Sequence, residues 1–138
     1  MFDKLILIID TEIDFLRIKK ISAENNPNID FINAPSEQLA CEILTSLHLK
    51  NKLPNLIFID INIFKDATNL LKLLKENKKL QIIPIIALVN NDLSILKKET
   101  TFNCLLPKPD DEKEFEKVIL SIFFFWFKIA KLPNKNYI

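Results

Sequence analysis

The sequence of 138 residues contains no glycine. Phosphate-cradling loops and dinucleotide-binding fingerprints need glycine, because the backbone must approach the phosphates closely or adopt a positive φ. We therefore expect neither kind of site. Left-handed turn positions must be filled by other residues, and asparagine is the usual substitute. The asparagines expected in such positions are Asn25, Asn26, Asn51, Asn77, Asn90 and Asn91.

Histidine and cysteine are also scarce, with one and two copies. A catalytic triad or a histidine-based metal centre would depend on His48 alone. Its position near the end of a predicted helix favours a C-terminal cap instead. Cys41 and Cys104 fall on a predicted helix and a predicted strand, where they are typical of core-filling thiols in a reducing compartment.

The chain also lacks an excess of one charge and long uncharged apolar runs. Its 19 basic and 18 acidic residues are interspersed and give a formal net charge of +1, so nothing favours a nucleic-acid partner. No uncharged apolar segment reaches about 18 residues, and the N-terminus lacks the pattern of a secretory signal. We expect a cytoplasmic protein that neither binds nucleic acid nor enters a membrane.

The residues that are present indicate one globular domain. Apolar residues make up 49% of the chain and charged residues 27%, which is sufficient for an ordinary core. A length of 138 residues fits a single domain, and no linker or internal repeat interrupts it. We therefore expect one domain over residues 1–138 with nothing attached.

Short apolar strands alternate with helical patterns along the whole chain. Strands are expected at about 4–10, 29–33, 55–60, 82–88 and 102–106, and helices at about 14–24, 37–47 and 110–131, with one more helix across a leucine-rich segment near 70–74 and a short tail at 132–138. Five strands that alternate with helices through right-handed crossovers predict an α/β fold with a doubly wound parallel sheet.

Charged side chains follow three of the predicted strands. Asp10 ends the first strand, Asp60 ends the third, and Lys108 comes just after the fifth. In open α/β sheets, ligands bind beyond the carboxyl ends of the strands, so these three residues should converge on one edge. A structural ion pair that stabilises the strand ends is the alternative explanation.

This ordered set of two acids and a lysine resembles the receiver domain of response regulators (CheY-like). The resemblance covers essentially the whole chain and implies a flavodoxin-like sheet with strand order 2-1-3-4-5. Stand-alone regulators of the cyanobacterial phytochrome-partner type resemble the chain more specifically, at residues 54–62 (PNLIFIDIN), 103–104 (NC) and 125–133 (FWFKIAKLP).

The resemblance implies a role for each residue of the set. Asp60 would be the phosphoacceptor, and a histidine kinase or phosphotransfer protein would be the donor. Asp10 and Asp60 would hold Mg²⁺ together with the main-chain carbonyl of Asn62. Lys108 would pair with Asp60 and then with the phosphoryl oxygens. A hard, oxygen-liganded cation and a lysine can indeed neutralise a transferring phosphoryl group.

The chain departs from the family pattern at positions that matter for metal binding and switching. Asp10 is followed by Thr11, where a second acid is usual, so Mg²⁺ affinity should fall unless Glu12 reaches into the site. Val89 replaces the serine or threonine after the fourth strand, and Leu105 replaces the aromatic switch residue of the fifth. We therefore expect a partly degenerate switch.

The last predicted helix has more apolar surface than one core can cover. One helical stripe should pack on the sheet, and it consists of Phe115, Val118, Ile119, Ile122, Trp126 and Ile129. Leu120, Phe124 and Phe127 form a second ridge on nearly the opposite side. We expect that ridge to form a homodimer interface or to dock a partner protein. The alternative is that residues 134–138 fold back over it.

Three functions remain open at this point. The first is a stand-alone receiver in a two-component phosphorelay that is phosphorylated on Asp60. The second is a pseudo-receiver, a protein-interaction module that acts without phosphorylation, which Thr11, Val89 and Leu105 favour. The third is an enzyme such as a small phosphatase or a flavin protein. The lack of glycine and of a cysteine nucleophile motif argues against it, so we expect no enzyme.

Overall fold

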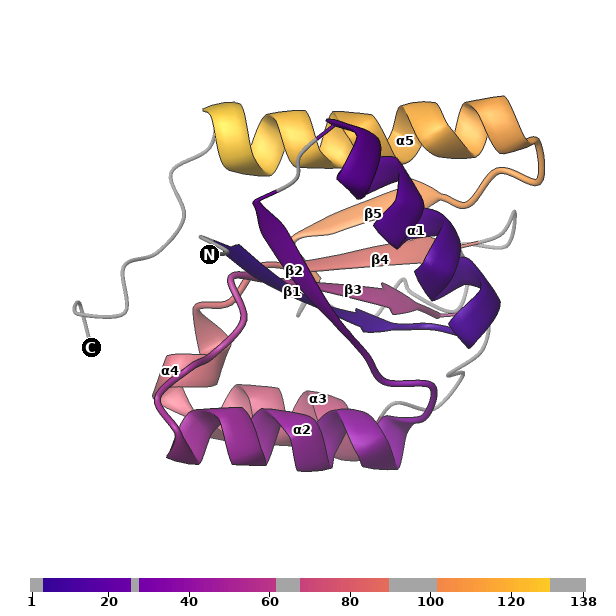
Figure 1. The fold of residues 1–138 in the computed structure, drawn as a ribbon. Coiled ribbons are helices and arrows are strands. Elements are labelled where there is room, and N and C mark those ends of the chain that lie inside the picture. Colours follow the sequence, from indigo (N-terminus) through magenta and orange to yellow (C-terminus); the bar gives the residue numbers. More distant parts are fainter. Residues whose placement is uncertain (1–3, 26–27, 62–67, 90–101, 130–138) are drawn as a thin grey trace.

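The computed structural model describes residues 4–25, 28–61, 68–89 and 102–129; of these, residues 128 and 129 are described by their backbone only. Strands and helices are distributed along all of these residues (Figure 1). In chain order they are β1 (Lys4–Ile9), α1 (Glu12–Asn25), β2 (Ile29–Asn33), α2 (Glu37–Leu49), β3 (Leu56–Asp60), α3 (Thr68–Glu76), α4 (Lys78–Gln81), β4 (Ile85–Val89), β5 (Cys104–Pro107), α5 (Glu112–Phe124) and a π-helical turn (Phe125–Ile129).

The five strands form one parallel sheet in the order β2-β1-β3-β4-β5. Helices α1 and α5 cover one face of the sheet, and α2, α3 and α4 cover the other (Figure 1). This confirms the predicted doubly wound α/β fold and its strand order. The order changes direction between β1 and β3, which is where ligands bind in folds of this kind.

The sheet divides the core into two apolar clusters. Side chains alternate along each strand, so that Leu7 and Ile9 of β1 pack under α2, α3 and α4, whereas Ile6 and Ile8 pack under α1 and α5. Strands β1, β3 and β4 lie inside the sheet and are buried over most of their length. Their near-continuous apolar sequence is the pattern of strands buried on both faces.

The strand register brings the ends of β1, β3 and β5 to one edge of the sheet. Ile9 pairs with Ile59, so the acidic residues that follow them lie on neighbouring strands. Leu88 pairs with Asp60 on one side and with Leu106 on the other, and the lysine comes two residues after Leu106. The convergence expected from the sequence is therefore built by the parallel ladder itself.

Two asparagines align the strand beginnings at the opposite edge. Asn55 donates its backbone N–H to the carbonyl of Leu5 over 2.8 Å, and its side-chain oxygen accepts from the N–H of Leu5 over 2.9 Å. Asn103 makes the same pair of bonds to Ile85, at 2.9 and 2.8 Å. Each asparagine thus closes a ring that fixes β3 against β1 and β5 against β4.

A third asparagine fills the role expected in a chain without glycine. Asn51 has φ 57° and is the one described residue with a positive φ. Its N–H donates to the carbonyl of His48 and the N–H of Lys52 to that of Leu47, which is the Schellman ending of α2. Among the other candidates, Asn25 lies in a helix and Asn77 caps one with φ −115°, while residues 26, 90 and 91 lie outside the described residues.

Side-chain caps fix the N-terminal ends of two helices. Ser36 caps α2 by accepting from the N–H of Leu39 over 3.2 Å, and Asp111 caps α5 by accepting from that of Glu114 over 3.0 Å. His48 differs from its prediction, because its ring lies 3.3 Å from the side-chain amide of Asn77 instead of capping α2. None of the described helices is long and apolar enough to span a membrane.

The fourth strand begins later than predicted. It was expected from residue 82, but the chain forms the short helix α4 first, and Ile82 caps it. Pro84 precedes the strand, and its backbone nitrogen has no proton to donate to a ladder. The strand therefore starts at Ile85. Residues 90–101, which follow the strand, lie outside the described residues.

The prediction of a second exposed ridge on the last helix is wrong for Phe127. Phe123 is 1% exposed, and the ring of the half-buried Phe127 lies 6.2 Å from it, against the same core cluster. Ile119, Phe123 and Phe127 are spaced four apart, so they share one helix face and widen the stripe that packs on the sheet. Phe124 remains exposed, and Phe125 is exposed beside it.

Candidate functional site

Four charged side chains meet at the carboxyl edge of the sheet. The Lys108 Nζ lies 3.0 Å from an oxygen of Asp10 and 2.6 Å from an oxygen of Asp14, and it also forms an ion pair with Asp60. Asp10 and Asp60 are buried, and Lys108 and Asp14 are largely shielded. The three predicted residues are therefore brought together, and a third carboxylate joins them. We refer to these four residues as the strand-end cluster.

Asp10 is held at the end of β1 by the backbone of the next residue and by a side chain of β2. The N–H of Thr11 donates to the Asp10 carboxylate over 2.7 Å. The side-chain amide of Asn33 donates to the backbone carbonyls of Ile8 and Asp10, at 3.2 and 3.0 Å. These contacts fix the chain where it leaves the sheet, and nothing in the sequence pattern had singled out Asn33.

The ladder itself positions Asp60 and Lys108. Asp60 is the last residue of β3, and the N–H of Ile61 donates to the carbonyl of Leu88 over 3.1 Å. The N–H of Lys108 donates to the carbonyl of Val89 over 2.7 Å. Both main chains thus continue the β-sheet hydrogen bonding past the strands, and both side chains start from fixed points.

Asp14 was not predicted as part of the site. It lies in the first turn of α1, four residues after Asp10, and the helix direction returns its carboxylate to the end of β1. The Thr11 hydroxyl accepts from its backbone N–H over 3.3 Å, and Arg17 binds its other oxygen over 2.9 Å. An acid in the first turn of a helix that begins directly after a strand-end acid is a signal that could have found it.

The cluster contains three carboxylates and one ammonium group, and its pKa shifts reflect this imbalance. Burial raises the pKa of Asp10 above its ordinary 3.8, and the Lys108 ammonium offsets the effect only in part. Burial alone would raise the pKa of Asp14 as well, but hydrogen bonds from Lys108 and Arg17 outweigh it and lower that pKa. Burial disfavours the Lys108 ammonium, yet the three carboxylates outweigh it and raise its pKa.

The donor set fits a hard divalent cation. Carboxylate oxygens of Asp10, Asp14 and Asp60 all lie within 4.8 Å of one another, and oxygen ligands are what Mg²⁺ and Mn²⁺ prefer. One lysine leaves an excess of negative charge that a cation would neutralise. Glu12 begins α1 with an exposed side chain and is not in this group, and Asn62 lies outside the described residues.

The two positions expected to be degenerate lie on the neighbouring strands β4 and β5. The Val89 side chain is buried in the core cluster under α2, α3 and α4 and offers no hydroxyl to the site. Leu105 is 42% exposed on β5 and carries no aromatic ring. Neither side chain therefore carries a polar group.

Several known proteins are similar to this chain, although no protein-family model matches it. Over 84 residues it is 36% identical to the response regulator Rcp1 of a Synechocystis strain, and the match covers 58% of this chain and 57% of that protein. The matched segment thus spans little more than half of that relative.

Solved structures match over a longer part of the chain. The Mn²⁺-bound form of the response regulator Rcp1 has a TM-score of 0.76 and 28% identity, with 95% of this chain and 99% of that chain covered. The phosphorylated cyanobacterial phytochrome response regulator RcpA has a TM-score of 0.80 and 23% identity over the same shares. A response regulator in red-light signalling of R. palustris has a TM-score of 0.79 and 19% identity, again with 95% and 99% covered.

Proposed function

We propose that this chain, a CheY-like receiver domain of the response-regulator class, accepts a phosphoryl group on Asp60 in two-component signal transduction. The observation that carries the proposal is the strand-end cluster, in which Asp60 ends β3 beside Asp10 and forms an ion pair with Lys108. A carboxylate beside a cation-binding acid and a lysine matches what phosphoryl transfer requires. The similarity to a phosphorylated regulator of a cyanobacterial phytochrome is consistent with it.

The proposed reaction is an in-line displacement at phosphorus. One carboxylate oxygen of Asp60 attacks the phosphorus of a phosphohistidine, carried by a histidine kinase or a phosphotransfer protein. A P–O bond forms, the P–N bond breaks, and the electron pair of that bond stays with the imidazole nitrogen, which takes up a proton from solvent. Lys108 balances the charge that spreads over the phosphoryl oxygens.

Mg²⁺ is the proposed cofactor, held by Asp10 and Asp60 with the main-chain carbonyl of Asn62. When bound, it would supply positive charge for the phosphoryl oxygens that a single lysine cannot match. The Mn²⁺-bound form of a similar regulator supports a divalent cation. Thr11 is exposed and supplies no carboxylate, so we expect weak affinity. The third carboxylate near this site is Asp14, and Glu12 does not join it.

The direct test is phosphorylation of the full chain by acetyl phosphate with Mg²⁺. We expect a mass gain of about 80 Da in the wild type and none in Asp60→Asn. Asp110→Asn is the matched control, because it makes the same change at an exposed aspartate. A wild-type chain with no Asp60-dependent gain, from acetyl phosphate or a cognate kinase, would disprove the proposal.

The alternative proposal is a pseudo-receiver that binds partners without phosphorylation. Two observations favour it: Val89 is a core residue with no hydroxyl, and Leu105 has no aromatic ring. The hydroxyl and the aromatic switch residue that the family usually carries at these two positions are therefore both missing. Under this alternative, partner binding survives Asp60→Asn and is lost in Phe124→Glu. Binding that fails in Asp60→Asn and is restored by phosphorylation of the wild type would instead favour the receiver.

A homodimer through the last helix is part of the proposal. Leu120 is half-buried, and Phe124 is 60% exposed next to the exposed Phe125, whereas Phe127 packs on the core. The surface available for a partner is therefore narrower than the ridge predicted from the sequence. Sedimentation that shows a monomer at high micromolar concentration would argue against the dimer. A cytoplasmic location and a single receiver domain over residues 1–138 complete the proposal.

A further inference from the structure

The Lys108 ammonium contacts a residue outside the sheet as well as the acids at the strand ends. It lies 2.6 Å from Asp14 of α1 and 3.0 Å from Asp10 at the end of β1. These contacts join residues that are 94 and 98 positions apart in sequence. The lysine is therefore held between a strand end and a helix, and the helix contributes one of its closest partners.

Asp14 is itself fixed by a second contact, which uses its other carboxylate oxygen. Its Oδ1 binds the Arg17 guanidinium over 2.9 Å, while its Oδ2 binds Lys108. The two oxygens thus have separate cationic partners, which sets the orientation of the carboxylate. The lowered pKa of Asp14 agrees with an ionised side chain that bridges two cations.

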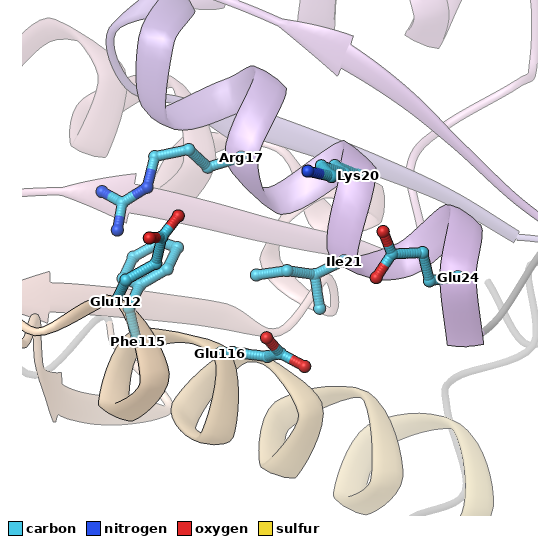
Figure 2. A pocket seen from close by; sticks show the side chains of 7 residues that line it. All are labelled: Arg17, Lys20, Ile21, Glu24, Glu112, Phe115 and Glu116. Atoms are coloured by element: carbon cyan, nitrogen blue, oxygen red, sulfur yellow. The ribbon is translucent and has the colours of Figure 1, made fainter.

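Arg17 connects this arrangement to the last helix. Its guanidinium carbon lies 4.2 Å from the centroid of the Phe115 ring, within the range of a cation–π contact. Phe115 is buried on the face of α5 that packs against α1 and the sheet. Figure 2 shows the Arg17 side chain extending from α1 to Phe115 and Glu112, along one side of a pocket between the two helices.

We propose that Asp14 is a positioning residue that holds the Lys108 ammonium against Asp60, and that Arg17, seated on Phe115, holds Asp14. Together these contacts form a continuous path from the strand-end cluster to α5. They link the site to the α1–α5 face without Val89 or Leu105. This inference rests on the proposed phosphorylation of Asp60, because the lysine matters for that reaction.

The physical reason is that a lysine has a long, flexible stem. Four rotatable bonds separate its ammonium from the strand, and an amine free to choose among several carboxylates would spend part of its time away from Asp60. A fixed anion on the helix restricts that motion. Positioning of this kind contributes to a rate by keeping the charge where the reaction needs it.

The experiment uses the full chain with ¹⁵N-labelled lysine and two readouts. The first is the NMR signal of the Lys108 ammonium, assigned by its loss in Lys108→Arg; hydrogen bonding to carboxylates slows its exchange with water. The second is the rate of phosphorylation of Asp60 by acetyl phosphate. We expect Asp14→Asn to abolish the ammonium signal and to slow phosphorylation by about tenfold. Arg17→Gln should weaken the ammonium signal and slow phosphorylation, each to a smaller extent than Asp14→Asn does. Asp14→Glu, which keeps the carboxylate, should retain most of the wild-type rate.

Glu114→Gln is the matched control. Glu114 also lies in the first turn of a helix and also pairs with a basic residue three positions later, Lys117, at 3.2 Å. It lies outside the strand-end cluster, so the signal and the rate should not change. If Asp14→Asn only weakened its helix, melting temperature would fall while both readouts stayed at wild-type levels.

Two results would overturn the inference. The first is an unchanged Lys108 signal and an unchanged rate in Asp14→Asn. The second is a lost signal with an unchanged rate, which would mean that the contact does not serve the reaction. A wild-type chain that is not phosphorylated would disprove the proposed function, and the ammonium signal would then still decide whether Asp14 and Arg17 hold the lysine.

Discussion

The backbone N–H of Lys108 donates to the carbonyl of Val89 over 2.7 Å, one residue past the end of β5. The lysine thus remains in the sheet ladder at its main chain while its side chain enters the strand-end cluster. Val89 lacks the expected hydroxyl, yet its carbonyl still fixes the origin of the lysine. Loss of a polar side chain at this position has therefore not removed the backbone support of the site.

Removal of the lysine should destabilise the protein strongly. In Lys108→Met, three carboxylates remain close together without their ammonium partner, so we expect the free energy of unfolding to fall by about 3–5 kcal/mol. Urea denaturation at pH 7 with EDTA measures it. Lys117→Met, which breaks an exposed ion pair on α5, should cost no more than about 1 kcal/mol. Equal losses in the two variants would contradict the prediction.

The same lysine should give the protein an alkaline limit of stability. Its pKa in the folded state lies above the ordinary 10.5, so its contribution is complete below pH 10.5 and is lost as the pH rises through the folded value. We expect the free energy of unfolding to fall above pH 10.5 in the wild type, and to fall less steeply in Lys108→Met. Parallel curves for the two proteins would argue against a raised pKa.

Two acids of the cluster should respond to neutralisation with opposite signs at pH 7. Burial raises the pKa of Asp10, so its charged form costs stability, and Asp10→Asn should raise the free energy of unfolding by about 1 kcal/mol. The pKa of Asp14 is lowered, so its charge stabilises above pH 3.8 and that contribution is lost as the pH falls through the folded value. Asp14→Asn should therefore lower stability. Denaturant titrations of the two variants with EDTA measure both free energies of unfolding. Changes of the same sign in the two variants would contradict this prediction.

Adjacent phenylalanines on α5 should differ greatly in their contribution to stability. Phe123 is 1% exposed between Phe31, Phe58 and Phe127, and Phe123→Ala should cost about 3–5 kcal/mol. Phe124 is 60% exposed, and Phe124→Ala should change stability by no more than about 0.5 kcal/mol. Thermal unfolding of the pair measures the difference. A large loss in Phe124→Ala would indicate that a partner or the chain itself covers it.

The end of α2 offers a direct test of the missing glycine. Asn51 has φ 57°, where a Cβ atom is disfavoured and only glycine is free of cost. Asn51→Ala should lower the free energy of unfolding by about 1 kcal/mol, and Asn51→Gly should raise it by a few tenths. Chemical denaturation distinguishes the two directions. Destabilisation by glycine would show that the Asn51 side chain contributes more than its backbone conformation.

Much of the fold was predictable because strands buried in a parallel sheet have short, nearly continuous apolar sequences that stand out from the helices. Apolar runs located all five strands, and the charged residues that end them placed Asp10, Asp60 and Lys108 at one edge. The start of β4 was missed because Ile82 and Ile83 continue the apolar run, although Pro84 marks the place where pairing can begin. Apolar character alone does not reveal where the ladder starts.

The site was predictable only where it depends on strands. Asp14 was missed because its carboxylate reaches the cluster from a helix, and the direction of that helix depends on packing against α5 and the sheet. Phe127 was misplaced for a related reason. Its contact with the core depends on Phe123, which lies four residues after Ile119 but was not part of the predicted stripe.

The division of the core by the sheet has a consequence for its two cysteines. Cys41 packs against the cluster under α2, α3 and α4, and Cys104 packs against the cluster under α1 and α5. Both thiols are free and half-buried, and burial raises the pKa of each. The alkylation rate of each thiol in the intact protein would therefore measure how often the core on its side of the sheet opens to solvent. The two natural cysteines report on the two sides separately.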